Sequence, residues 1–194
     1  YGWVTTGASN LGELNLLMKE VSIRRRKEEV LELPPKIRSW VPVDISGSNA
    51  AFNAVEGFLT WYAGTDPSQP NDTEFLARLM KVRTALHKAK QGAVGERIRD
   101  VVTSGEKVVV FTCFSDGIER HKRKLGDSAV TITGSDTPEQ RMAAVDRFQK
   151  DETVKVALCN IIAGGVGITL TAGTHVIFQD LDWVPANHAQ AEDR

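Results

Sequence analysis

The sequence has few cysteines and no long apolar run. Only two of its 194 residues are cysteine, Cys113 and Cys159, and they stand apart in apolar segments. Two separated cysteines form neither a disulfide framework nor a zinc-type pair, so we expect reduced thiols buried in an intracellular protein. No stretch is long enough to span a membrane and no secretory signal is present, so nothing indicates a membrane partner.

The chain also lacks an excess of charge of either sign. Its 24 basic and 25 acidic residues give a net charge of -1, which argues against a wholly basic nucleic-acid binder but permits a local basic groove. The length fits one large domain, or one domain plus part of another. Because Tyr1-Gly2-Trp3 is not a natural beginning, we expect a piece of a longer protein.

Several kinds of catalytic motif are missing as well. The glycines of 164–167 follow an apolar run, but neither a phosphate-loop lysine nor the third glycine of a dinucleotide site accompanies them. A tight turn and a phosphate contact both remain open for this loop. His175 and His188 have no third ligand at metal-site spacing, so no metal site is predicted. Asp180 and Asp182 alternate on an extended segment and should face opposite ways.

The first hundred residues are predicted to be mainly helical. Residues 37–45 alternate apolar and polar, which predicts a strand, and 64–72 read as a loop. Basic side chains gather late in this region, and they indicate either a solvated helix face or a DNA-contacting face: Lys81, Arg83, His87, Lys88 and Lys90. The predicted helices cover residues 10–21, 22–33, 49–62, 73–90 and 94–103.

From Gly105 onward strands and helices alternate. Ser115 is expected to cap one helix, and Thr137, followed by Pro138 and by Gln140 at the third helical position, to cap the next. This alternation predicts an open parallel sheet whose carboxyl-end loops form one composite surface. The predicted strands are 107–111, 129–133, 154–158 and 175–178, and the loops are 112–116, 134–137, 159–169 and 179–185.

Near the end of the chain, Gln190 and Arg194 are four residues apart and would share one face of a helix. An arginine there can reach a nucleotide phosphate held by another domain, because its fork of donors suits γ-phosphate oxygens. An ordinary ion pair of Arg194 with Glu192 or Asp193 is the alternative.

These segments together resemble motifs IV, IVa, V and VI of the Swi/Snf family of superfamily-two helicase-like ATPases. Residues 23–36 resemble the block that joins the two lobes of that family, and Asn160-Ile161-Ile162 is similar to the branch with annealing helicases and their bacterial relatives. The motifs occur in order as Lys107–Phe111 with Phe114, Gly134-Ser135 with Arg141, Gly164–Gly167 with Thr169-Leu170, and Trp183-Val184-Pro185 with Gln190–Arg194.

The resemblance implies an α/β fold: a RecA-like open parallel sheet flanked by helices, the C-terminal lobe of a helicase-like motor. Residues 1–36 would be the inter-lobe segment or the end of the first lobe. Residues 37–194 would be the C-terminal lobe, with 104–194 as its core βα repeat, ending within motif VI. Neither the Walker A lysine nor the DExH carboxylates of a first lobe are present, and Asp151-Glu152 does not qualify because a loop carries it.

The resemblance further implies an ATP-dependent translocase on double-stranded DNA that remodels or reanneals DNA structures, in the setting of DNA repair. ATP and Mg²⁺ would be held mainly by the missing first lobe, so this chain alone should be inactive. The partners would be double-stranded or branched DNA and the N-terminal RecA-like lobe of the same protein. The location would be intracellular: cytoplasmic or nucleoid in bacteria, nuclear in eukaryotes. A chromatin or transcription-complex remodelling motor and an inert helicase-like scaffold remain as alternatives.

Motif positions assign the site residues that the resemblance implies. Arg194 would be catalytic, and a second motif VI arginine would lie three residues beyond it. ATP would contact Gly165, Gly167, Gln190 and Arg194. DNA phosphates would contact Thr112, Ser115, Gly134, Ser135, Arg141, Asn160 and Thr169.

Overall fold

The computed structural model describes residues 9–23, 25, 29, 36–45, 47–66, 71–164 and 167–194. The chain divides into two compact units, 1–41 and 42–194. In the first unit, helix α1 (Leu11–Val21) confirms the helix predicted for 10–21, and its leucines are exposed. The helix predicted for 22–33 lies mostly outside the described residues. The predicted domain boundary at residue 36 stays a prediction.

The strand predicted for residues 37–45 is wrong. These residues carry no helix or strand, and Ile37 and Trp40 are 92% and 85% exposed. An alternating pattern becomes a strand only when a neighbouring strand pairs with it and a core covers its apolar face. This segment has neither among the residues that the structure describes.

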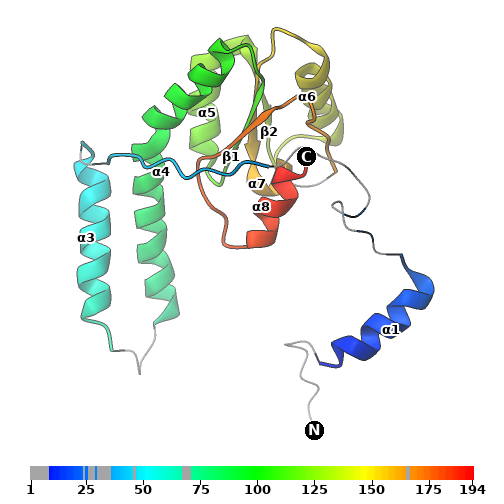
Figure 1. Cartoon of the computed structure of the whole chain (residues 1–194). Helices are drawn as coiled ribbons and strands as arrows, with labels where there is room; N and C mark the ends of the chain where they lie inside the picture. The colour runs from blue at the N-terminus through cyan, green and yellow to red at the C-terminus, as the bar shows by residue number, and fades with distance from the viewer. Residues whose placement is uncertain are drawn as a thin grey trace. The chain divides into compact units, whose positions relative to one another are not determined.

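The second unit begins with a helical hairpin made of α3 (Asn49–Ala63) and α4 (Asp72–Thr103) (Figure 1). The helix predicted for 49–62 is confirmed, but the two helices predicted for 73–90 and 94–103 are one continuous helix. Gly92 does not interrupt α4, since a glycine costs a helix only about 1 kcal/mol. Buried side chains on either side of it, Gln91 and Val94, fasten the helix to the rest of the unit.

A four-stranded parallel sheet forms the centre of this unit. It consists of β1 (Val108–Thr112), β2 (Ala129–Ile132), β3 (Val156–Asn160) and β4 (His175–Phe178), in the order β2-β3-β1-β4. β1 pairs in parallel with both β3 and β4, and β2 pairs in parallel with β3. The predicted open parallel sheet is therefore confirmed, with the observed β3 beginning and ending two residues later than predicted.

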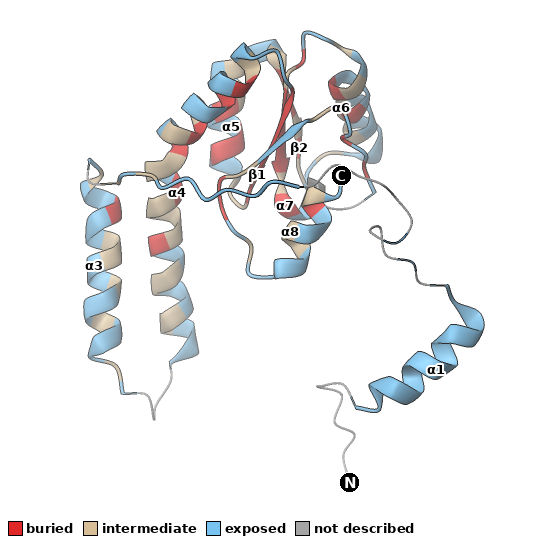
Figure 2. Ribbon diagram, in the orientation of Figure 1, coloured by how far each residue is buried: buried red, intermediate tan, exposed pale blue. Residues whose placement is uncertain are grey.

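Helices cover both faces of the sheet, and Figure 2 shows the buried residues between these layers. One core cluster joins Ile98 of α4 and Ile118 of α5 (Ser115–Leu125) to Val110 of β1. The other joins Phe148 of α6 (Pro138–Lys150) to Phe111 of β1. The remaining short helices are η1 (Gly126–Ser128), α7 (Ile161–Gly164) and α8 (Pro185–Glu192).

The capping residue predicted from the sequence is confirmed at α6 and wrong at α5. Thr137 and Gln140 form the predicted capping box at α6, with Pro138 as the first helical residue. Ser115 does not cap α5, because the cap position falls on Phe114 and Ser115 is already helical.

The C-terminal end of α6 is bonded to a buried lysine. Lys107 donates from Nζ to the carbonyl oxygens of Phe148 and Asp151, at 2.6 and 2.9 Å.

Membrane-spanning helices and metal-binding clusters are both absent from the described residues. Within that part of the chain, no helix is both long and apolar enough to cross a membrane. The same residues contain no group of three or more His, Cys, Asp and Glu side chains that could hold a metal ion.

Candidate functional site

The carboxyl ends of the four parallel strands lie at one edge of the sheet, and three of the loops that leave this edge line a common pocket. The pocket has a volume of about 190 Å³. Its lining comes from the β1–α5 loop, the end of β3 with α7, the β4–α8 connection and the facing side of α4. The lining residues are Met80, Arg83, Cys113, Phe114, Asn160, Ile161, Ile162, Asp182 and Trp183.

The fourth loop, between β2 and α6, contributes no side chain to this pocket. β2 is an edge strand, two positions away from β1. At about 4.8 Å per strand, that places its end roughly 10 Å from the end of β1. The predicted composite surface therefore extends along the edge, with three loops gathered around β1 and β3 and one set apart.

The segment after the glycines is bonded to the end of the chain. The Leu170 amide donates to the backbone oxygen of Arg194 at 2.7 Å. Ala191 of α8 is buried in the same core cluster as Ile168 and Leu170. These contacts pack the motif V and motif VI segments against each other.

A compact turn leads into α8. Asp182 accepts hydrogen bonds on Oδ1 from the Val184 amide and from Asn187 Nδ2, both at 2.8 Å. The Asp182 amide in turn donates to His188 Nε2 at 2.9 Å. The bond from the Val184 amide is the main cause that holds the pKa of Asp182 below its usual value. This carboxylate therefore joins the turn before α8 to Asn187 in the first turn of that helix.

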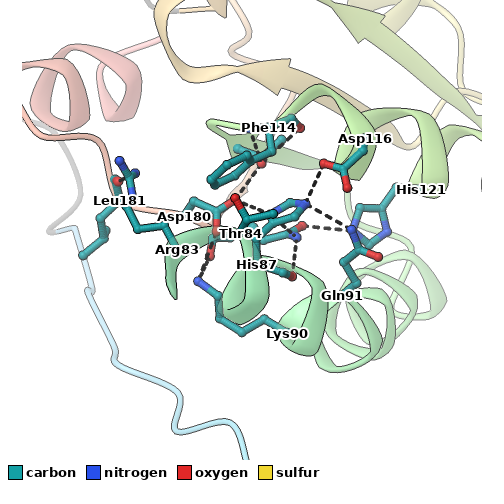
Figure 3. Close-up of polar contacts among 12 residues, drawn as sticks. Arg83, Thr84, His87, Lys90, Gln91, Phe114, Asp116, His121, Asp180 and Leu181 are labelled. Carbon is teal, nitrogen blue, oxygen red and sulfur yellow. Dashed lines mark hydrogen bonds and ion pairs between the residues drawn. The ribbon is translucent and has the colours of Figure 1, made fainter. Parts of the chain in front are cut away.

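A buried polar network lies behind this turn (Figure 3). His87 of α4 is fully buried, and its Nδ1 lies 2.7 Å from Asp180 Oδ2. The same oxygen accepts from the Thr112 hydroxyl at 2.7 Å, and Lys90 Nζ lies 3.2 Å from Asp180 Oδ1. Burial alone raises the pKa of Asp180. The bonds from His87 and Thr112 and the Lys90 charge outweigh burial, so the pKa lies below its usual value.

The far side of the imidazole faces further polar groups. Gln91 Nε2 lies 3.0 Å from His87 Nε2, and Asp116 Oδ1 lies 3.3 Å from it. Nδ1 is thus directed at Asp180, and Nε2 at Gln91 and Asp116. Gln179 completes the network, since its Oε1 lies 3.0 Å from His121 Nε2. Burial is the main cause that lowers the pKa of His121.

The structure separates the predicted DNA contacts by exposure. Thr112 is buried and uses its hydroxyl on Asp180. Asn160 and Arg141 are half-buried, and Asn160 Oδ1 accepts from the Ile162 amide at 3.1 Å. The DNA-contact roles all stay predictions. The exposed members of the predicted set are Ser115, Gly134, Ser135 and Thr169.

The predicted nucleotide contacts lie around α8 and the glycine loop. Gly165 lies outside the described residues, while Gly167 is exposed with a φ of 69°. Gln190 is exposed on α8, and Arg194 is half-buried beyond the end of that helix. The shared helix face predicted for Gln190 and Arg194 is therefore wrong. The last turn tightens instead, with the Arg194 amide 3.4 Å from the Ala191 oxygen.

The network around His87 was not predicted from the sequence. His87 was expected on an exposed basic helix face, whereas the structure buries it completely. One signal was present: Arg83, His87 and Lys90 recur at helical spacing and so share a face. Asp180, the partner of His87 and Lys90, could not be assigned from sequence, because it lies 93 residues beyond His87 in the chain.

Comparison with known proteins identifies the family of the chain. Residues 93–194 match the model of the helicase conserved C-terminal domain, which is just over half of the chain. The chain belongs to the helicase C-terminal domain family. This family places the glycine loop and α8 within a domain type shared by helicases, and it confirms the predicted helicase-like resemblance.

Curated relatives of this helicase C-terminal domain confirm the predicted Swi/Snf resemblance. The chain is 38% identical over 99% of its length to the DNA annealing helicase and endonuclease ZRANB3 of Bos taurus. It is 36% identical over its full length to the SWI/SNF-related matrix-associated actin-dependent regulator of chromatin subfamily A-like protein 1 of Xenopus tropicalis. It spans only 18% and 21% of these proteins.

Solved structures confirm the fold of this helicase C-terminal domain. The Sulfolobus solfataricus SWI2/SNF2 ATPase core domain matches with a TM-score of 0.66 at 23% identity, over 95% of this chain and 43% of that chain. The C-terminal domain of that ATPase matches with a TM-score of 0.56 at 23% identity, over 70% of this chain and 67% of that chain. At this identity the likeness concerns the fold alone.

Proposed function

We propose that the chain is the second motor lobe of an ATP-dependent translocase on double-stranded DNA that remodels or reanneals DNA structures. The observation that supports this most directly is the joining of the motif V and motif VI segments at the carboxyl edge of the sheet. The bond from Leu170 to Arg194 and the burial of Ala191 fasten them together. A surface that must respond to nucleotide and DNA together needs such a rigid link between its two halves.

The residues present fit part of a nucleotide site. Gln190 offers an exposed amide, Arg194 a guanidinium, and Gly167 a backbone open to close approach by phosphate. The carboxylates and the lysine that would hold Mg²⁺ and the phosphates have no counterpart in the sequence. ATP would therefore be shared with a first lobe, where it would supply the phosphoryl group, while Arg194 stabilises charge on the γ-phosphate oxygens.

The proposal for DNA rests on the exposed loops and on the relatives. Ser115, Ser135 and Thr169 offer hydroxyls at the sheet edge, which can hold phosphates without an excess of positive charge. One relative is named as a DNA annealing helicase, and a Swi/Snf ATPase core of the same fold was solved in complex with double-stranded DNA. We therefore propose that the protein acts inside the cell and moves along double-stranded DNA.

The test is ATP hydrolysis by the full-length protein, with and without duplex or forked DNA. Arg194→Ala should lower kcat by about 10³-fold or more, the scale of an arginine that stabilises a phosphoryl-transfer transition state. The DNA dissociation constant should stay within about twofold, because phosphate contacts elsewhere supply that affinity. Arg99→Ala, at an exposed position on α4, is the matched control and should keep full activity.

Three outcomes would count against the proposal. Unchanged turnover in Arg194→Ala would remove the catalytic role of that residue. Robust hydrolysis by residues 1–194 alone would contradict the assignment as a second lobe. A full-length protein with no ATPase activity in the presence of DNA would favour the inert scaffold instead.

A further inference from the structure

One face of α4 contacts the connection between β4 and α8. Arg83, His87 and Lys90, here called the α4 stripe, follow each other at intervals of four and three residues. All three contact residues 179–183, which link the last strand to α8. Figure 3 shows the three side chains directed from α4 toward Asp180 and Leu181.

Each member of the stripe holds a different part of the connection. Lys90 donates to the backbone oxygen of Gln179, and Arg83 donates to that of Leu181. His87 holds the carboxylate of Asp180 between these two carbonyls, at 2.7 Å. The Arg83 guanidinium also lies over the Trp183 ring, 4.2 Å from its centroid. Four of the five residues from 179 to 183 are thus held by one helix face.

We propose that the α4 stripe is a positioning device for the ATP site, because it fixes the connection from which α8 and Arg194 start. The proposal rests on the proposed function, since it assumes that Arg194 acts on ATP. The stripe touches neither nucleotide nor DNA in this role. It holds Asp180, and the following turn at Asp182 leads into α8. The stripe therefore determines the placement of α8.

The chemistry of the stripe favours positioning over stability or DNA binding. His87 is fully buried and cannot reach a DNA phosphate. A buried ion pair contributes little net stability over apolar packing, but it does fix one geometry, because charge and hydrogen-bond direction must both be met. Geometry matters for catalysis, since misplacing a catalytic group by about 1 Å can cost about 10²-fold in rate.

The test uses DNA-stimulated ATP hydrolysis by the full-length protein. His87→Leu should lower kcat at least tenfold, with the KM for ATP and the DNA dissociation constant within twofold. His87→Asn should recover most of the activity, because its side-chain amide can replace Nδ1–H as the donor to Asp180. Lys90→Met should also lower kcat, whereas Lys88→Met, an exposed lysine of the same helix, should not.

Hydrogen exchange of the same variants gives a readout that is independent of activity. In His87→Leu, exchange of the amides of residues 179–184 should rise by more than the loss of global stability accounts for, whereas the rise in β1 should not exceed that loss, which urea unfolding measures. An equal rise throughout the sheet, with no excess at residues 179–184, would mean a purely general loss of stability and would overturn the proposal. So would wild-type kcat in His87→Leu, or an equal loss of DNA affinity in Lys88→Met and Lys90→Met, which would indicate a DNA-contacting face.

The two proposals can fail separately. If the full-length wild-type protein shows no DNA-stimulated ATPase activity, the proposed function fails. If the wild type is active, Arg194→Ala is inactive and the stripe variants match the wild type, only the positioning role fails.

Discussion

Replacing Gly117 with alanine would test how tightly the network around His87 is packed. Gly117 is a buried position in the first turn of α5. A Cβ added there would lie 2.5 Å from Cε1 and 2.8 Å from Nε2 of His87. Carbon atoms in contact ordinarily lie about 3.5–4.0 Å apart, so the ring or the helix would have to move by about 1 Å.

The size of the effect follows from what that movement breaks. A shift of 1 Å lengthens the 2.7 Å contact between His87 and Asp180 beyond hydrogen-bonding distance. Losing a hydrogen bond to a charged group costs about 1.5–3 kcal/mol, and overpacking adds about 1–3 kcal/mol. Alanine returns about 1 kcal/mol through its better helix propensity. Gly117→Ala should therefore lower the free energy of unfolding by about 1.5–5 kcal/mol.

Urea unfolding followed by circular dichroism measures this directly, and Gly92→Ala provides the control. Gly92 is exposed within α4 and an added Cβ there meets nothing within 4 Å, so alanine should stabilise by up to about 1 kcal/mol. In a His87→Ala background the clash disappears, and Gly117→Ala should become neutral or stabilising. Stabilisation by Gly117→Ala in the wild-type background would refute this reasoning.

Two further predictions concern buried charge. Burial lowers the pKa of His121 in the fold, so the unfolded chain takes up a proton more readily as the pH falls through about 6.5. The free energy of unfolding should therefore fall below that pH, by up to about 1.4 kcal/mol per unit, and His121→Gln should flatten the dependence while keeping a donor to Gln179. Lys107→Met removes two bonds to the end of α6 and should destabilise by about 2–3 kcal/mol, whereas the exposed Lys124→Met should change stability by less than about 0.5 kcal/mol in the same urea titration. A flat pH profile in the wild type would contradict the first prediction, and a neutral Lys107→Met the second.

The parts of the fold that could be predicted depend on neighbours in sequence. Thr137 and Gln140 cap α6 through bonds between residues three positions apart, so their pattern was sufficient. The alternation after Gly105 predicted the parallel sheet, because a parallel connection requires a crossover between its strands. The strand predicted at 37–45 failed because its pairing partner cannot be read from its own residues.

The candidate site was predictable in outline for a similar reason. Parallel strands place their carboxyl ends at one edge, so the loops that carry the motifs were expected together. Burial was not predictable, since it depends on contacts between distant segments. Thr112 and His87 read as surface residues, yet both are buried against Asp180, which lies 68 and 93 residues away from them in sequence.

The long sequence separation between His87 and Asp180 has a consequence for synthesis on the ribosome. At roughly 5–20 residues per second, the 93 residues between them take about 5–20 s to translate. During that time His87 and Lys90 lack the Asp180 carboxylate, and β1 lacks its neighbour β4. The nascent lobe thus carries an open strand edge until β4 emerges, which is the kind of surface that chaperones cover.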